Sequence, residues 1–151
     1  KNQTCVLIDQ NGIVFTVASK PLDLEVIDGN PAEFMRRSSV VTTHNLSLGE
    51  PFLPAGGRIG LETARTFLTT QGFVIKKIYL APLGFFDVEA IYKESQVQVE
   101  FRFRDTKKMN EQISELYLAL EKGLRQKIRD NTVEYVISYV PQKVIYKNTE
   151  K

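Results

Sequence analysis

Hydrophobic and polar residues alternate with a period of two over much of the chain, and the period changes to 3.6 in two longer segments. The alternation is cleanest over residues 96–104, where an apolar residue occupies every second position from Val97 to Phe103. A period of two sends successive side chains to opposite faces of a strand. The pattern therefore predicts an antiparallel strand with one face in the core and the other in water.

Further strands are predicted from the same alternation or from runs of β-branched residues. These segments are 4–8, 13–18, 22–26, 39–43, 73–80, 86–92, 132–140 and 143–146. Asn11 and Gly12 lie between the first two, and this dipeptide favours the positive φ angles of a tight hairpin turn. Pro82 and Gly84 mark a second turn in the middle of the chain.

Helices are predicted at 31–37, 58–71 and 107–130. In the longest one, apolar residues recur every three or four positions from Met109 to Ile128, which predicts a stripe packed on the apolar face of the preceding strand. Gly123 interrupts this helix at a cost of ~1 kcal/mol relative to alanine. We expect a closely packed neighbour to account for that glycine.

Strands that follow one another through short turns favour an antiparallel meander over a parallel sheet. The sequence thus predicts an α+β fold, with a mainly antiparallel sheet packed against one long helix and one or two shorter helices. A length of 151 residues predicts a single globular domain, 1–151. Because the chain begins with Lys1 and not with methionine, we expect it to be a processed or excised part of a longer protein.

Charge and cysteine content narrow the classes of function. Lys and Arg total 20 against 18 Asp and Glu, and a net charge of +2 is too small to indicate nucleic-acid binding. Cys5 is the only cysteine, which excludes an intrachain disulfide and a cysteine-cluster zinc site. No stretch approaches the ~20 apolar residues of a membrane-spanning helix.

Catalytic motifs are missing from the sequence. It contains no Gly-x-Ser-x-Gly elbow, phosphate-binding Walker loop, His-Glu-x-x-His pair or EF-hand loop. His44 is the only histidine and is interpreted as a surface loop residue, while Cys5 is interpreted as a small buried residue of a strand. We therefore predict no catalytic residue, no metal ligand and no cofactor, which favours a protein that is not an enzyme.

Gly56, Gly57 and Arg58 form the candidate anion site, because the amide groups of a helix start can hold an anion and an arginine would assist them. The alternative is that the two glycines only let a loop turn into a helix.

Arg102 and Arg104 share one strand face, and Lys107 and Lys108 follow at once, so these four residues are the candidate nucleic-acid site. Glu100 lies in the same row, and the aromatic residues needed to stack on bases lie on the opposite face. A solvated charged face is the favoured interpretation.

The loop at 46–54 supplies the remaining candidates. Leu48, Phe52 and Leu53 are expected either to be exposed for a partner or to fold back onto the domain. We predict an assembly or protein-interaction domain that binds a protein partner or a second copy. It would be the soluble portion of a membrane-anchored complex of the cell envelope, attached through a segment outside this chain. The alternatives are a small-molecule or anion pocket between the long helix and the sheet and, less favoured, nucleic-acid binding.

Overall fold

The computed structural model describes residues 5–9, 11–18, 25–35, 48–53 and 55–149. The strands are β1 Cys5–Ile8, β2 Val14–Ala18, β3 Val26–Gly29, β4 Phe73–Leu80, β5 Phe85–Tyr92, β6 Val97–Arg104, β7 Val133–Ile137 and β8 Ile145–Asn148. The helices are α1 Pro31–Met35, α2 Ala55–Thr70, α3 Met109–Ala119 and α4 Arg125–Arg129. Two predicted strand segments, 39–43 and most of 22–26, lie outside the described residues.

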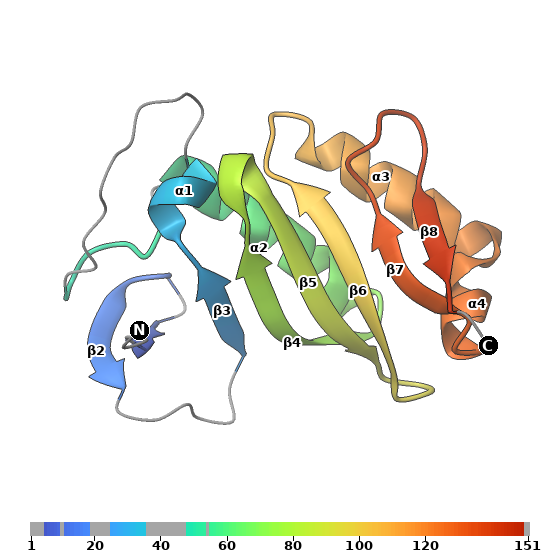
Figure 1. The fold of residues 1–151 in the computed structure, drawn as a ribbon, viewed down its shortest axis with the longest axis horizontal. Coiled ribbons are helices and arrows are strands. Elements are labelled where there is room, and N and C mark those ends of the chain that lie inside the picture. Colours follow the sequence, from blue (N-terminus) through green and yellow to red (C-terminus); the bar gives the residue numbers. More distant parts are fainter. Residues whose placement is uncertain (1–4, 10, 19–24, 36–47, 54, 150–151) are drawn as a thin grey trace.

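The strands form two sheets (Figure 1). β1 and β2 make a small antiparallel hairpin, and the other six strands form one sheet in the order β3-β4-β5-β6-β7-β8. The α+β fold is confirmed, but the larger sheet is mixed and not a meander throughout. β4, β5 and β6 are antiparallel neighbours, whereas β3 runs parallel to β4 and β7 runs parallel to β6. A helical segment lies between the strands of each parallel pair and returns the chain to the starting end of the sheet.

The larger sheet consists of two units with the same order of elements. In each unit a strand, a helical segment and a parallel strand are followed by an antiparallel strand. The first unit comprises β3, α2, β4 and β5, and the second comprises β6, α3 with α4, β7 and β8. The antiparallel pairing of β5 with β6 joins them. This repeat of topology has no visible counterpart in the sequence.

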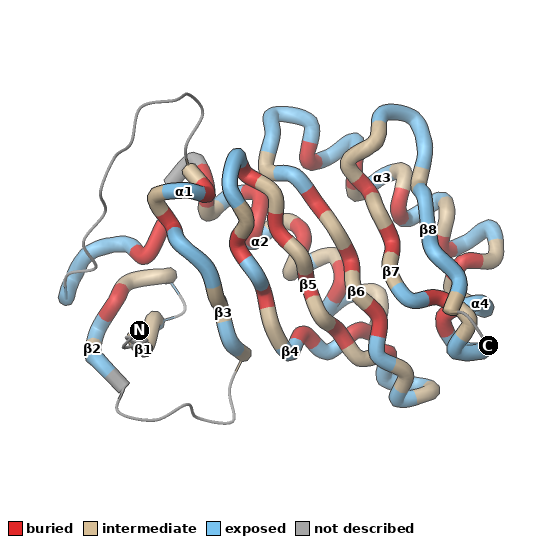
Figure 2. Tube along the Cα trace, viewed as in Figure 1, coloured by how far each residue is buried: buried red, intermediate tan, exposed pale blue. Residues whose placement is uncertain are grey.

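The core lies between the sheet and the helices, which cover one of its faces (Figures 1 and 2). Phe101 and Phe103 of β6 are completely buried, so the predicted inward direction of this strand's apolar face is confirmed. The ring of Phe101 meets that of Phe73 edge-on at 5.0 Å, and the ring of Phe103 stacks on that of Phe86 at 5.3 Å. Such aromatic pairs add stability beyond the area that they bury.

The predicted long helix is broken at Gly123. A π-helical turn, Leu120–Leu124, separates α3 from α4, and Gly123 has a φ of 121° within it. A Cβ atom at this position would meet nothing within 4 Å, so the expected close neighbour is not there. Glycine is needed at position 123 because the backbone has a positive φ there, and other residues adopt this conformation only with strain. The break leaves Leu120, Leu124 and Ile128 all buried.

The other side of the six-stranded sheet is covered by no helix within the described part of the chain (Figure 1). We call this side the open face, and it comprises the side chains that alternate with the core residues along β3 to β8. Its central members, Asp87, Glu89, Glu100 and Arg102, are half-buried by their neighbours. No described helix is long and apolar enough to cross a lipid bilayer.

Candidate functional site

The predicted anion site at the start of α2 has a structural role in the fold. Gly57 is buried, and a Cβ atom there would overlap the sulfur of Met35, so the glycine lets α1 pack against α2. Arg58 donates a hydrogen bond from Nη1 to the backbone oxygen of Asn11 at the hairpin turn. Gly57 and Arg58 thus join α1 and the hairpin to α2. Anion binding at Gly56, Gly57 and Arg58 stays a prediction.

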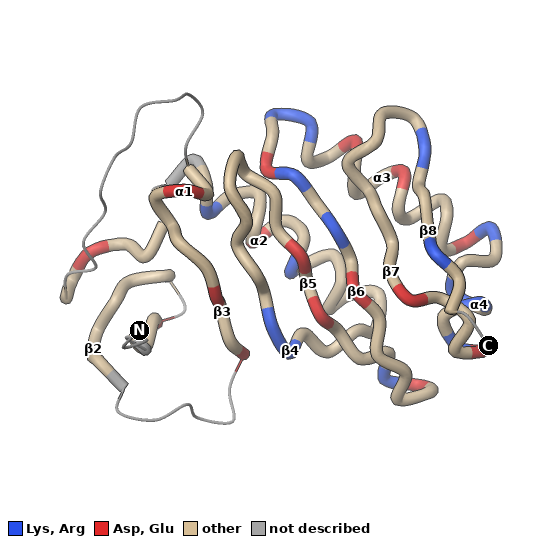
Figure 3. Tube along the Cα trace, viewed as in Figure 1, with Lys and Arg blue, Asp and Glu red and all other residues tan. Residues whose placement is uncertain are grey.

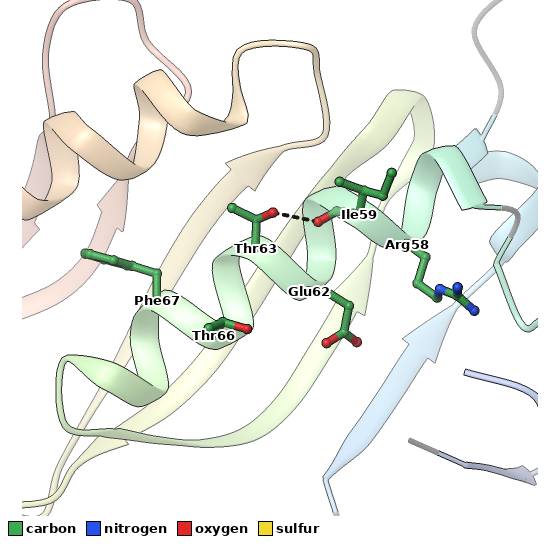
Figure 4. Close-up of a pocket in the computed structure, with 6 residues that line it drawn as sticks. All are labelled: Arg58, Ile59, Glu62, Thr63, Thr66 and Phe67. Atoms are coloured by element: carbon green, nitrogen blue, oxygen red, sulfur yellow. Dashed lines mark hydrogen bonds between the residues drawn. The ribbon is translucent and has the colours of Figure 1, made fainter. Parts of the chain in front are cut away.

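A shallow hollow of 540 Å³ lies beside α2 (Figure 4). Its lining residues all belong to that helix: Arg58, Ile59, Glu62, Thr63, Thr66 and Phe67. Thr63 donates its hydroxyl to the backbone oxygen of Ile59 at 2.8 Å, and Arg58 is engaged with the hairpin turn. The hollow therefore has few free polar groups, and it does not lie between the long helix and the sheet, where a ligand pocket was expected.

The three apolar side chains of the loop, which were expected either to be exposed or to fold back, divide between the two alternatives. Phe52 and Leu53 are 7% and 3% exposed and belong to the core, whereas Leu48 is 64% exposed. The loop is fixed to β2, since the amide of Val14 donates to Glu50 and the amide of Gly49 donates to Val14. Phe52 and Leu53 fold back because the core buries their apolar surface. Phe52 and Leu53 thus follow the second of the two expectations and fold back, while partner binding by this loop stays a prediction with Leu48 as its exposed residue.

The four basic candidates occupy two places. Arg102 and Arg104 project from β6 on the open face, while Lys107 and Lys108 lie in the turn before α3. Arg102 donates from Nε to Glu100 Oε1 at 2.6 Å, and Lys108 lies 3.7 Å from a carboxylate oxygen of α3. Two of the four charges are thus already paired, which weakens the support for nucleic-acid binding.

Aromatic rings hold both arginines of the open face. The guanidinium of Arg102 lies 3.9 Å from the ring centre of Tyr135, and that of Arg104 lies 4.7 Å from the ring centre of Phe85. Phe85 in turn meets Tyr139 edge-on at 5.1 Å. Cation–π contacts of this kind fix the direction of an arginine without neutralising its charge. Arg104 has no carboxylate within 4 Å among the described residues.

The centre of the open face is acidic (Figure 3). Across the β5–β6 ladder Asp87 is opposite Arg102, and Glu89 is opposite Glu100. Arg102 is bound to Glu100 on its own strand, so Asp87 and Glu89 have no ion pair in the described part of the chain. Like charges directly opposite one another in a sheet are destabilising. We call Asp87, Glu89 and Glu100 the acidic centre.

Asp87 has a perturbed proton affinity. Burial raises the pKa of its carboxyl above the ordinary value of 3.8, and the negative charge of Glu100 raises it further against the opposing effect of Arg102. The sequence analysis missed Asp87 and Glu89 because the strand pattern shows only that they face outward. Their opposition to Arg102 and Glu100 depends on the register of the β5–β6 ladder.

The chain has one histidine and one cysteine, His44 and Cys5. His44 and the side chain of Cys5 lie outside the described part of the chain. Among the described residues no three His, Cys, Asp or Glu side chains converge as a metal site would require. Comparison of the chain with protein-family models and with curated proteins gave no match.

Proposed function

We propose that this protein is an assembly domain whose chains associate in pairs through the open faces of their sheets. The observation that supports the proposal is the open face itself: the described helices lie on one side of the six-stranded sheet, and the other side presents charges of both signs. Parallel strand pairs such as β3–β4 and β6–β7 are usually found in sheets covered on both faces. A partner sheet would supply the second layer.

The size of the face supports a stable pair. Six strands spaced about 4.8 Å apart, with eight residues in each of the three central strands, give a face of about 600 Å². Two such faces would together bury about 1,200 Å², which reaches the lower end of standard protein interfaces. Two sheets pack about 10 Å apart when their inner side chains interdigitate.

The composition of the face also suits a protein interface. Aromatic residues and arginine are enriched in interfaces over the remaining surface. The open face has Tyr79, Phe85 and Tyr135 beside Arg102 and Arg104. Tyr79 is 48% exposed near the end of β4, next to Asp87 in the β4–β5 register. A second sheet would bury these rings and exclude water from the charges between them.

Charge selects a second copy as the occupant. Each open face has an unpaired carboxylate at Asp87 and an unpaired guanidinium at Arg104, two positions further along the neighbouring strand. In a pair related by a twofold axis, every contact occurs twice with the two chains exchanged. Arg104 of either chain would therefore lie over Asp87 of the other. Of the other charges of the face, Lys77 pairs with Asp28 at 3.0 Å and Arg102 with Glu100, whereas Glu89 has no ion pair among the described residues.

Charge reversal with rescue tests this arrangement. Sedimentation equilibrium of the wild type should show a monomer–dimer equilibrium. Arg104→Glu places a carboxylate opposite Asp87, and Asp87→Arg places a guanidinium opposite Arg104. Each variant alone should dissociate at least about tenfold more readily, because like charges at an interface are costly. An equimolar mixture of the two should pair again, since both cross-contacts become attractive.

The control is Lys122→Glu, which reverses an exposed charge on the helical side of the molecule. It should associate like the wild type. Circular dichroism of each variant, and the rescue in the mixture, establish that the variants fold. A wild type that stays monomeric up to about 1 mM would overturn the proposal. Charge-reversed variants that associate as tightly as the wild type would overturn it equally.

A further inference from the structure

Asp87 has charged or titratable neighbours on each strand that packs against it. Tyr79 is its register partner on β4, Arg102 is its partner on β6, and Glu100 lies two residues before Arg102. Glu89 projects from the same face of its own strand. Arg102 is the only one of these that could neutralise Asp87, and its Nε is bound to Glu100.

The more distant cations of this face form no ion pair with Asp87 either. Lys77, the register partner of Glu89 on β4, pairs with Asp28 at 3.0 Å. Arg104 lies over Phe85 and donates from Nε to the backbone oxygen of Leu83 at 3.4 Å. In the free chain, therefore, the half-buried carboxylate of Asp87 has no direct cationic partner among the described residues, and the nearest formal charges include two other carboxylates.

We infer that pH controls the pairing of chains through Asp87, with the pair formed near neutral pH and released in mild acid. This inference rests on the proposed self-association. The guanidinium that completes the environment of Asp87 comes from the second copy, so the carboxyl changes its surroundings on association. Protonation removes the charge that Arg104 of the other chain would bind.

The direction of the pH dependence follows from the surroundings of Asp87 in the free chain and in the pair. In the free chain burial and Glu100 hold the pKa of Asp87 above its ordinary value. An arginine of the second copy lowers the pKa in the pair. A group whose pKa falls on association strengthens the complex fully at pH above the free-chain pKa, and this contribution is lost as pH falls from that value through the lower pKa of the pair. The loss therefore begins at a higher pH than for an ordinary aspartate.

Sedimentation equilibrium at about pH 7.5 and about pH 4.5 provides the test, with the fold monitored by circular dichroism. Every unit by which association lowers the pKa of Asp87 weakens the protonated pair about tenfold for each copy, and therefore about a hundredfold for the two copies in a pair. Asp87→Asn should associate more weakly than the wild type at neutral pH and should lack the acid step. The control variant Glu89→Gln should keep the step.

The outcomes separate the two proposals. A wild type that is monomeric at both pH values contradicts the self-association itself. A wild type that pairs equally well at both pH values contradicts only the control by pH. An Asp87→Asn variant that still dissociates on acidification overturns Asp87 as the switch. Carboxyl NMR gives an independent check: the midpoint of the Asp87 titration should be lower in concentrated than in dilute protein.

Discussion

At the scale of single residues, the open face contains charges that cost the folded chain stability. Asp87 is half-buried without an ion pair in the described chain, and Glu89 is opposite Glu100. A surface chosen for stability alone would place an opposite charge or an uncharged residue at such a position. Local conflicts of this kind concentrate at functional sites. The conflict is therefore consistent with a second surface that neutralises this one.

Asp87→Asn should stabilise the isolated chain while it weakens pairing. Because the pKa of Asp87 is raised in the folded chain, its contribution favours folding below the ordinary pKa and is lost as pH rises through the folded value. At pH 7 the variant should therefore gain roughly 0.2–1 kcal/mol in the free energy of unfolding, the range for a cross-strand pair. The gain should disappear near pH 3. Urea unfolding at dilute protein concentration measures the free energy of unfolding at both pH values. A variant less stable than the wild type at pH 7 would contradict the argument.

At the scale of elements, the sequence predicted what local pattern controls. Alternation located β4, β5 and β6, and helical periodicity located α2 and the stripe of α3. The parallel pairing of β3 with β4 and of β7 with β6 could not be predicted, because it depends on contacts between segments far apart in the chain. Burial of Phe52 and Leu53 was left open for the same reason. The candidate site depends on register, so the sequence identified Arg102, Arg104 and Glu100 on one strand but not the carboxylates opposite them on β5.

Gly123→Ala tests the break between α3 and α4. Helix propensity alone predicts that alanine would stabilise the chain by ~1 kcal/mol. The φ of 121° predicts the opposite, a loss of about 1–3 kcal/mol, because a Cβ atom strains this backbone. The control Lys122→Ala changes the neighbouring exposed residue and should be nearly neutral. Urea unfolding at neutral pH decides between the two, and a stabilised Gly123→Ala would show that the turn is not required.

At the scale of the whole molecule, the two topological units place all described α-helical cover on one side of a single sheet (Figure 1). The fold thereby has two unlike surfaces, one of helices and one of open strands. Exposed large hydrophobic residues occur on both, so exposure alone does not identify an interface. The helical surface includes Tyr117 and Leu118, each 46% exposed. The open face differs because its rings adjoin unpaired charges of both signs, which a second copy would match.

A matched pair of tyrosine variants separates the two surfaces. Tyr79 on the open face and Tyr117 on α3 are 48% and 46% exposed, so truncation removes a similar exposed ring from opposite sides of the molecule. Tyr79→Ala should weaken pairing by about tenfold or more, since tyrosines buried in an interface contribute strongly. Tyr117→Ala should leave pairing unchanged.

Sedimentation equilibrium at low and high salt adds a second distinction. Screening by salt should weaken the Arg104–Asp87 contacts and leave the apolar contribution of Tyr79 largely intact. If Tyr117→Ala weakens pairing and Tyr79→Ala does not, the chains associate through their helices, and the open face is not the interface.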